Sequence, residues 1–161
     1  MAKRVFFSFH YERDIWRASI VRNSWVVRNE REDAGFWDAS LWEEAKRKGE
    51  ESIRRMILKG LENTSVSAVL IGAETVTREW VIFEIIESFN RGNGLLGIFI
   101  DGIKDRTGRT DVRGLNPLSH VQTTRNGQTV LLSSIFRTYD WVTEDGYRNL
   151  ASWVESSKAR L

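Results

Sequence analysis

Short apolar runs alternate with stretches of helical spacing along this chain. Most of the apolar runs are rich in β-branched and aromatic residues, which is typical of buried strands. They occupy residues 4–9, 34–39, 65–72, 92–101 and 135–142. Helical spacing fills residues 12–26, 50–62 and 77–91, and a last helix follows Thr143. This alternation predicts an α/β fold whose central, mainly parallel sheet of about five strands is covered by helices on both faces.

The first and last of these helices each carry a face of apolar spacing. In the first helix that face holds Ile15, Trp16, Ser19, Ile20 and Asn23. In the last helix it holds Tyr147, Leu150, Ala151 and Val154. Stripes of this kind are typical of the side of a helix that packs against a core.

Two shorter signals lie between the main elements. Ser40 is placed to cap a short helix through Trp42, which Gly49 then interrupts. Asn126-Gly127 stands between two β-prone runs, and this dipeptide is typical of a two-residue hairpin turn.

The helix at 77–91, TREWVIFEIIESFNR, is apolar around most of its circumference, with Thr77 as a candidate N-cap. One acid, Glu84, falls inside the apolar run, and Trp80 stands four residues earlier on the same face. Desolvation among such neighbours raises the pKa of a carboxyl unless a partner compensates. The structural alternative is a surface ion pair between Glu84 and a neighbouring arginine.

In a parallel sheet of this kind, ligands bind beyond the carboxyl ends of the strands, where the strand order switches. Residues Ser8–Tyr11 lie at the end of the first strand, and Asp38 lies at the end of the second. The loop 72–77 follows the third strand, and the segment from Asp101 through Asn116 follows the fourth.

The composition describes an ordinary soluble protein that fits one domain over residues 1–161. A formal charge of +2 is too small to favour nucleic-acid binding. Without cysteine the chain has neither disulfides nor a thiolate nucleophile, and His10 and His120 lack the acid spacing of a metal site. The first residues do not form a signal peptide, and no apolar run reaches the ~20 residues that span a bilayer. A cytoplasmic protein is therefore expected.

Several motifs with known chemistry are absent or misplaced. Residues 92–97, GNGLLG, match GxGxxG, but they end a helix and open a strand, which is the reverse of a dinucleotide-binding turn. There is no phosphate-binding P-loop. A phosphoacceptor receiver domain shares the architecture, but Ser8-Phe9-His10 and Gly72 stand where its acidic residues would be expected.

Several segments together resemble one family, the TIR-like proteins typified by ThsB of the bacterial Thoeris anti-phage system. They are VFFSFHYERD, GFWDASLWEEAKRKG, TSVSAVLIGAET, REWVIFE, NGLLGIFI and GLNPLS, and they extend over residues 3–119. The resemblance implies a flavodoxin-like, three-layer fold. The segment from Trp42 to Gly49 departs from the loop that most TIR domains have there.

The resemblance also implies a function. Enzymatic TIR domains cleave the nicotinamide–ribose bond of NAD+, which is a substrate rather than a cofactor. ThsB-like proteins convert it, on sensing infection, into a cyclic ADP-ribose isomer that activates a ThsA-like effector. A phage-derived trigger and a homo-oligomer are therefore candidate partners, whereas nucleic acid and membrane are not.

The family's site residues fall on matching positions. The catalytic glutamate of TIR enzymes lies four residues beyond a tryptophan, which implies Glu84 as catalytic residue and Trp80 as substrate-binding residue. Phe7, Ser8 and Phe9 match the loop that lines the TIR site, and Asn116 lies in the family's Asn-Pro segment. With Asp38 these residues make up the expected substrate site, without a metal.

Cleavage of the nicotinamide–ribose bond requires only one carboxylate in the site. Nicotinamide in NAD+ leaves as a neutral molecule and needs no general acid, so a single acid can stabilise the oxocarbenium-like transition state. The competing interpretation is a TIR-like interaction module that senses a partner without catalysis.

Overall fold

The computed structural model of the chain describes residues 4–28, 32–37 and 39–158. The strands are β1 (Arg4–Ser8), β2 (Glu32–Ala34), β3 (Val66–Ile71), β4 (Gly94–Phe99), β5 (Gln122–Arg125), β6 (Gln128–Leu131) and β7 (Thr138–Asp140). The helices are α1 (Tyr11–Asn23), α2 (Ala39–Lys48), α3 (Glu50–Leu61), α4 (Glu79–Asn90) and α5 (Gly146–Lys158). Short helical turns are η1 (Ser24–Arg28), η2 (Thr75–Thr77), η3 (Pro117–His120) and η4 (Leu132–Ser134).

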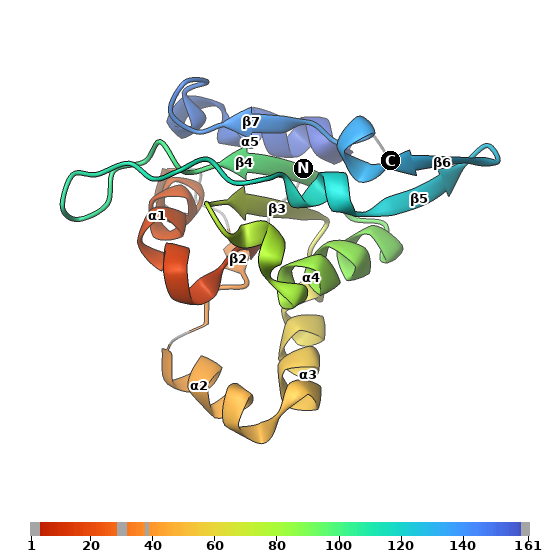
Figure 1. Ribbon diagram of the computed structural model, residues 1–161, viewed down its shortest axis with the longest axis horizontal. Coiled ribbons are helices and arrows are strands. Elements are labelled where there is room, and N and C mark those ends of the chain that lie inside the picture. Colours follow the sequence, from red (N-terminus) through yellow and green to blue (C-terminus); the bar gives the residue numbers. More distant parts are fainter. Residues whose placement is uncertain (1–3, 29–31, 38, 159–161) are drawn as a thin grey trace.

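Five strands form one parallel sheet in the order β2-β1-β3-β4-β7 (Figure 1). The register pairs Ser8 with Val69 and Val66 with Gly94. The order changes direction between β1 and β3, because β2 lies on one side of β1 and every later strand lies on the other. The predicted α/β fold with a parallel sheet of about five strands is confirmed.

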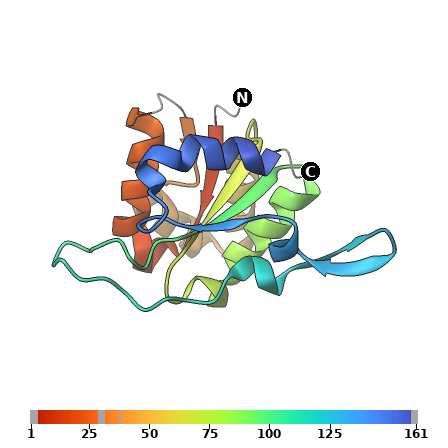
Figure 2. The same ribbon diagram turned by 90° about the horizontal axis from the view of Figure 1, so that it is seen from above.

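Helices cover both faces of the sheet, with α1 and α5 on one side and α4 on the other (Figure 2). Alternate residues of β1 supply the two faces, since successive side chains of a strand point in opposite directions. Phe7 packs in the core under α1 and α5, and Phe6 packs against α2 and α3. None of the helices in the described ranges is both long and apolar enough to cross a membrane.

The second strand is shorter and earlier than the predicted 34–39. It ends at Ala34 because Gly35 turns the chain with φ +89°. A Cβ at Gly35 would lie 2.3 Å from the carbonyl oxygen of Phe7, so only glycine fits this close approach. The last strand is likewise only Thr138–Asp140, within the predicted 135–142.

The start of α4 also differs from the prediction of a helix capped by Thr77. Residues Thr75–Thr77 form the separate turn η2, in which the Thr77 hydroxyl donates to the carbonyl of Glu74 at 2.7 Å. The helix therefore starts at Glu79, with Arg78 at the N-cap position.

The apolar face predicted for the first helix is not its buried face. Trp16 is 46% exposed and Ile20 also faces outward, whereas Arg17 and Ala18 are buried. Spacing alone is misleading here because the Arg17 guanidinium has backbone partners inside the protein. It donates to the carbonyls of Ile103 at 2.7 Å and Arg109 at 2.9 Å.

In α5 the predicted stripe is partly correct. Leu150 and Val154 are buried, but Tyr147 is 55% exposed. Trp153 takes part in the core instead, stacked on Tyr139 with ring centroids 4.3 Å apart. The predicted hairpin is confirmed, because β5 and β6 pair antiparallel around Asn126-Gly127, both with positive φ.

Candidate active site

A cleft lies beyond the carboxyl ends of β1 and β3, at the switch in strand order where a ligand crevice is expected. The residues that line it come from the end of β1, the start of α1, the segment after β2, α2, α3 and α4. They are Phe7, Phe9, Tyr11, Gly35, Trp37, Trp42, Ile57, Arg78, Trp80, Val81 and Glu84.

Among the described residues of this lining, Glu84 supplies the only carboxylate. It lies in the second turn of α4 and is 5% exposed. The Ser8 hydroxyl, at the end of β1, donates to its Oε1 at 3.1 Å. The pKa of Glu84 is raised to about 8, because burial raises it and the hydrogen bond from Ser8 offsets only part of that rise. The geometry thus contradicts the alternative of a surface ion pair with arginine.

The backbone explains why Ser8 and Glu84 meet. Ser8 alternates with Phe7 along β1, so its side chain points to the α4 side of the sheet. Val81 and Ile85 anchor α4 against β3 and β4, and this packing turns Glu84, directly before Ile85, toward the end of β1. A carboxyl with this pKa is mostly protonated at neutral pH, and a cation beside it would favour the ionised form.

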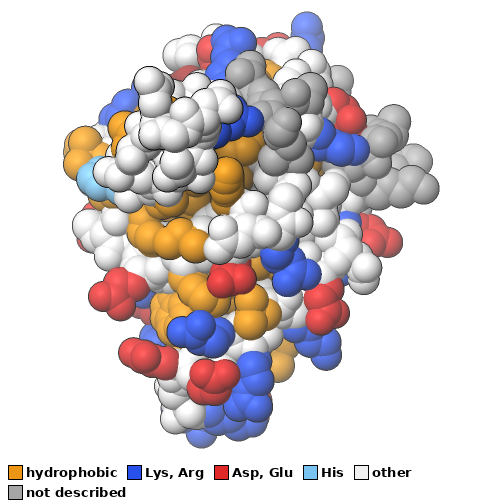
Figure 3. Space-filling model, turned by 90° about the vertical axis from the view of Figure 1, so that its right-hand side faces the viewer, with side chains coloured by type: hydrophobic (Ala, Val, Ile, Leu, Met, Phe, Trp, Pro, Cys, Tyr) orange, Lys and Arg blue, Asp and Glu red, His pale blue; other side chains and the backbone are white. Residues whose placement is uncertain are grey.

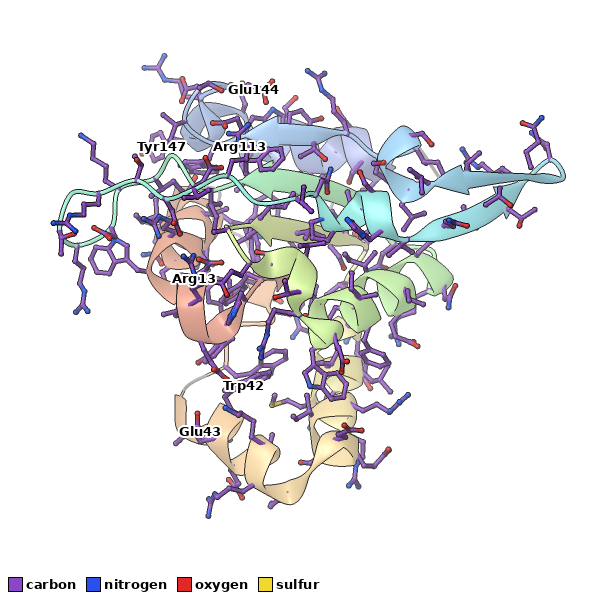
Figure 4. The ribbon with its side chains drawn as sticks, in the orientation of Figure 1. Arg13, Trp42, Glu43, Arg113, Glu144 and Tyr147 are labelled. Carbon is purple, nitrogen blue, oxygen red and sulfur yellow. The ribbon has the colours of Figure 1, made fainter. Side chains whose placement is uncertain are left out.

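Aromatic rings form most of the cleft wall. Phe9 and Tyr11 lie with ring centroids 5.8 Å apart, and Tyr11 and Trp42 lie 5.1 Å apart. Trp42 points from α2 toward α1, across to the body of the protein (Figure 4). Trp37 stacks on Trp42 at 6.0 Å. Such a wall excludes water and offers faces on which a flat, cationic ring can stack.

The structure brings most of the predicted substrate residues together. Phe7, Phe9 and Trp80 line the cleft, and Ser8 reaches it through its bond to Glu84. Sequence reasoning missed Tyr11, Trp37 and Trp42 as wall residues. The high number of tryptophans was a signal for a ring-lined pocket, but composition could not say which of them take part.

One predicted residue does not join this group. Asn116 makes structural bonds instead: its amide donates to the Thr138 hydroxyl at 2.8 Å, and its carbonyl oxygen accepts from the Leu118 backbone at 3.0 Å. It caps the η3 turn and is not part of the cleft lining. Asp38 lies outside the described residues.

No group of three or more His, Asp or Glu side chains within 4–28, 32–37 and 39–158 is placed to hold a metal ion. His10 has a structural bond, because its Nδ1 accepts from the backbone N–H of Arg13 at 3.3 Å and caps α1. Burial lowers the pKa of His10, and the nearby charge of Arg78 lowers it further.

A second groove lies between α4 and the β5–β6 hairpin. Figure 3 shows apolar side chains gathered on this side of the molecule, and Ile82, Ile86, Phe89 and Val121 line the groove. The only ionisable side chain among its described lining residues is His120, which is exposed. It therefore lacks the buried acid that distinguishes the cleft at Glu84.

Comparison with known families identifies the family to which this chain is similar. The family model described as "Thoeris protein ThsB, TIR-like domain" matches residues 6–105, which is more than half of the chain. The chain belongs to the ThsB family of TIR-like domains. The expected resemblance is confirmed.

A curated ThsB relative supports the same assignment over the full length. It is a protein of Bacillus cereus strain MSX-D12 named "Putative cyclic ADP-D-ribose synthase ThsB1". The two chains are 38% identical over 191 aligned positions, which cover 96% of this chain and all of the relative.

The ThsB match includes the site residues Phe7, Ser8, Trp80 and Glu84, whereas Asn116 lies beyond it. The segment from Trp42 to Gly49, where the sequence departs from typical TIR domains, forms most of α2 and the turn into α3. Because Trp42 lines the cleft, this ThsB chain builds part of its site wall from the divergent segment.

Proposed function

We propose that this ThsB-family protein is an NAD+-processing enzyme of anti-phage defence. It cleaves the nicotinamide–ribose bond and forms a cyclic ADP-ribose-type product, which activates a ThsA-like effector. NAD+ is the substrate, and the reaction uses no further cofactor. One observation carries the proposal: the buried carboxyl of Glu84, bonded to Ser8, in an aromatic cleft at the switch in strand order.

The cleft supplies the parts that this reaction needs. The cationic nicotinamide ring stacks against Trp80, and its charge favours the ionised form of Glu84, whose proton passes to solvent. The carboxylate then stabilises the positive charge that develops on the ribose as the C1′–N bond lengthens. Nicotinamide departs with the bonding electron pair as a neutral molecule, so no acid has to protonate it.

The second half of the reaction closes the ring. A hydroxyl oxygen or a base nitrogen of the same ADP-ribose unit forms the new bond to C1′. If a hydroxyl attacks, its proton passes to the Glu84 carboxylate, which restores the neutral acid. The aromatic wall of Phe9, Tyr11 and Trp42 keeps water from C1′ and thereby favours the cyclic product over free ADP-ribose.

The name of the Bacillus cereus relative, a cyclic ADP-D-ribose synthase, supports the product class, and the Thoeris family supports the link to a ThsA-type effector. We include an infection trigger in the proposal, so the protein should be purified both from uninfected and from phage-infected cells.

The test is incubation with NAD+ and chromatography of nicotinamide and nucleotide products. Wild-type protein from infected cells releases nicotinamide together with a cyclic product, and Glu84→Gln releases at least about a hundredfold less. Glu87→Gln, one turn further along α4 and outside the cleft lining, is the matched control and retains activity.

A ThsB protein that acts only as an interaction module gives a different result. Wild type and Glu84→Gln then both leave NAD+ intact in infected cells, although each supports defence equally well.

A further inference from the structure

We propose that Arg78 binds the diphosphate group of the dinucleotide at the mouth of the cleft. This inference rests on the proposed function, because it assigns a further part of the same substrate. Arg78 and Glu84 line the same cleft. Arg78 is half-buried, and within the described part of that lining it is the only Lys or Arg.

The Arg78 side chain has no structural partner that explains its place. Among the described residues, no carboxylate lies within ion-pair distance of its guanidinium, and no side-chain hydrogen bond uses it. The Glu12 carboxylate interacts with the charge of Arg78 but is engaged elsewhere, since it accepts from Lys46 Nζ at 2.7 Å. A half-buried cation without an ion pair is available to an anionic ligand.

Helix stability does not explain Arg78 either. It occupies the N-cap of α4, where its side chain makes no capping bond. A cation at this end of a helix is disfavoured by the helix dipole, and Ser, Thr, Asp or Asn would stabilise the helix better. The residue is therefore poorly suited to the fold and well suited to a ligand.

The backbone holds Arg78 firmly in this position. Its carbonyl accepts from the backbone of Val81 at 3.1 Å and of Ile82 at 3.3 Å, and its own N–H donates to Thr75 at 3.1 Å. Its extended conformation, with φ −89° and ψ 115°, separates η2 from α4 and directs the side chain to the cleft.

The distance along α4 fits one nucleotide unit. Glu84 is six positions after Arg78 in the sequence, which corresponds to about 9 Å along a helix axis. In NAD+ the reacting C1′ and the first phosphate are joined through the same ribose. With C1′ at Glu84, the diphosphate therefore lies toward the N-terminal end of α4, where a planar guanidinium can bind two phosphate oxygens.

Binding of ADP-ribose, which carries the diphosphate, and of adenosine, which does not, tests this site by calorimetry. The proteins are wild type, Arg78→Gln, Arg78→Lys and the control Arg55→Gln, an exposed position on α3 outside the cleft lining. Loss of a charge-assisted bond weakens ADP-ribose binding about tenfold to a hundredfold in Arg78→Gln. Adenosine binding stays within about twofold, Arg78→Lys retains part of the affinity for ADP-ribose, and Arg55→Gln matches wild type.

Three results overturn the inference: equal ADP-ribose affinity in wild type and Arg78→Gln, an equal loss for ADP-ribose and adenosine, or no ADP-ribose binding by wild type. Measuring the KM for NAD+ tests the phosphate site independently of whether the proposed cleavage occurs. Arg78-dependent binding of ADP-ribose without NAD+ cleavage refutes the proposed reaction and leaves the phosphate site standing. If Arg78→Gln cleaves NAD+ with an unchanged KM and binds ADP-ribose with unchanged affinity, the phosphate site is refuted and the proposed reaction stands.

Discussion

Replacing Glu84 by glutamine should stabilise the protein increasingly as pH rises. Burial raises the pKa of Glu84 from 4.5 to about 8 in the folded protein. Below pH 4.5 the carboxyl is protonated in both the folded and the unfolded state. Between the two values the unfolded chain has released the proton that the folded chain still holds. The folded state then binds more protons, so the free energy of unfolding falls as pH rises.

The size of this effect follows from the two pKa values. Each pKa unit corresponds to about 1.4 kcal/mol, so the stability lost well above pH 8 amounts to about 5 kcal/mol, of which about 3 kcal/mol is already lost at pH 7. Both stability losses are upper limits, because relaxation of the site and entry of water reduce the cost of a buried charge. Glutamine is neutral at every pH and can still accept the hydrogen bond from Ser8, so Glu84→Gln does not suffer this loss.

Urea unfolding of wild type, Glu84→Gln and the control Glu87→Gln at about pH 5, 7 and 9 measures the difference. The free energies of wild type and Glu84→Gln should converge at the acidic end and separate steadily toward pH 9, while Glu87→Gln follows wild type. If the free energies of unfolding of wild type and Glu84→Gln differ by the same amount at all three pH values, the carboxylate is solvated or paired. The Glu84 carboxyl is then not a buried group with a raised pKa.

Three further substitutions probe the neighbours of Glu84. Ser8→Ala removes the bond that lowers the pKa of Glu84, so the rise of NAD+ cleavage with pH should move to higher pH in a pH–rate profile. Trp80→Ala should raise the KM for NAD+ by about tenfold or more through loss of ring stacking, whereas Trp80→Phe retains most of the affinity in steady-state kinetics. Asn116→Ala should lower the free energy of unfolding by about 1 kcal/mol in urea, because it removes the η3 cap and the bond to Thr138, and should leave NAD+ cleavage unchanged.

The sequence was sufficient for the parts of the fold that depend on local pattern. The apolar runs located β1, β3, β4 and β7, and the helical spacing around Glu84 located α4. The buried environment of Glu84 could also be predicted, because an acid surrounded on its own helix by Trp, Phe and Ile has few routes to solvent.

Errors arose where contacts distant in sequence decide the outcome. The inner face of α1 carries Arg17 because carbonyls of the segment after β4 accept its hydrogen bonds, and no helical periodicity reveals those acceptors. Asn116 matched a family segment, but its amide is used by Thr138, which lies far along the chain. The cleft wall formed by Trp37 and Trp42 likewise depends on how α2 packs over Tyr11.

The most direct measurement of the central claim is the time course of nicotinamide release from NAD+ by wild-type and Glu84→Gln protein purified from phage-infected cells. Wild type should release nicotinamide and a cyclic ADP-ribose-type product in equal amounts, and Glu84→Gln should release neither at a comparable rate while remaining folded. Equal rates of release by the two proteins would contradict the assignment of the buried carboxyl as the group that acts on the nicotinamide–ribose bond.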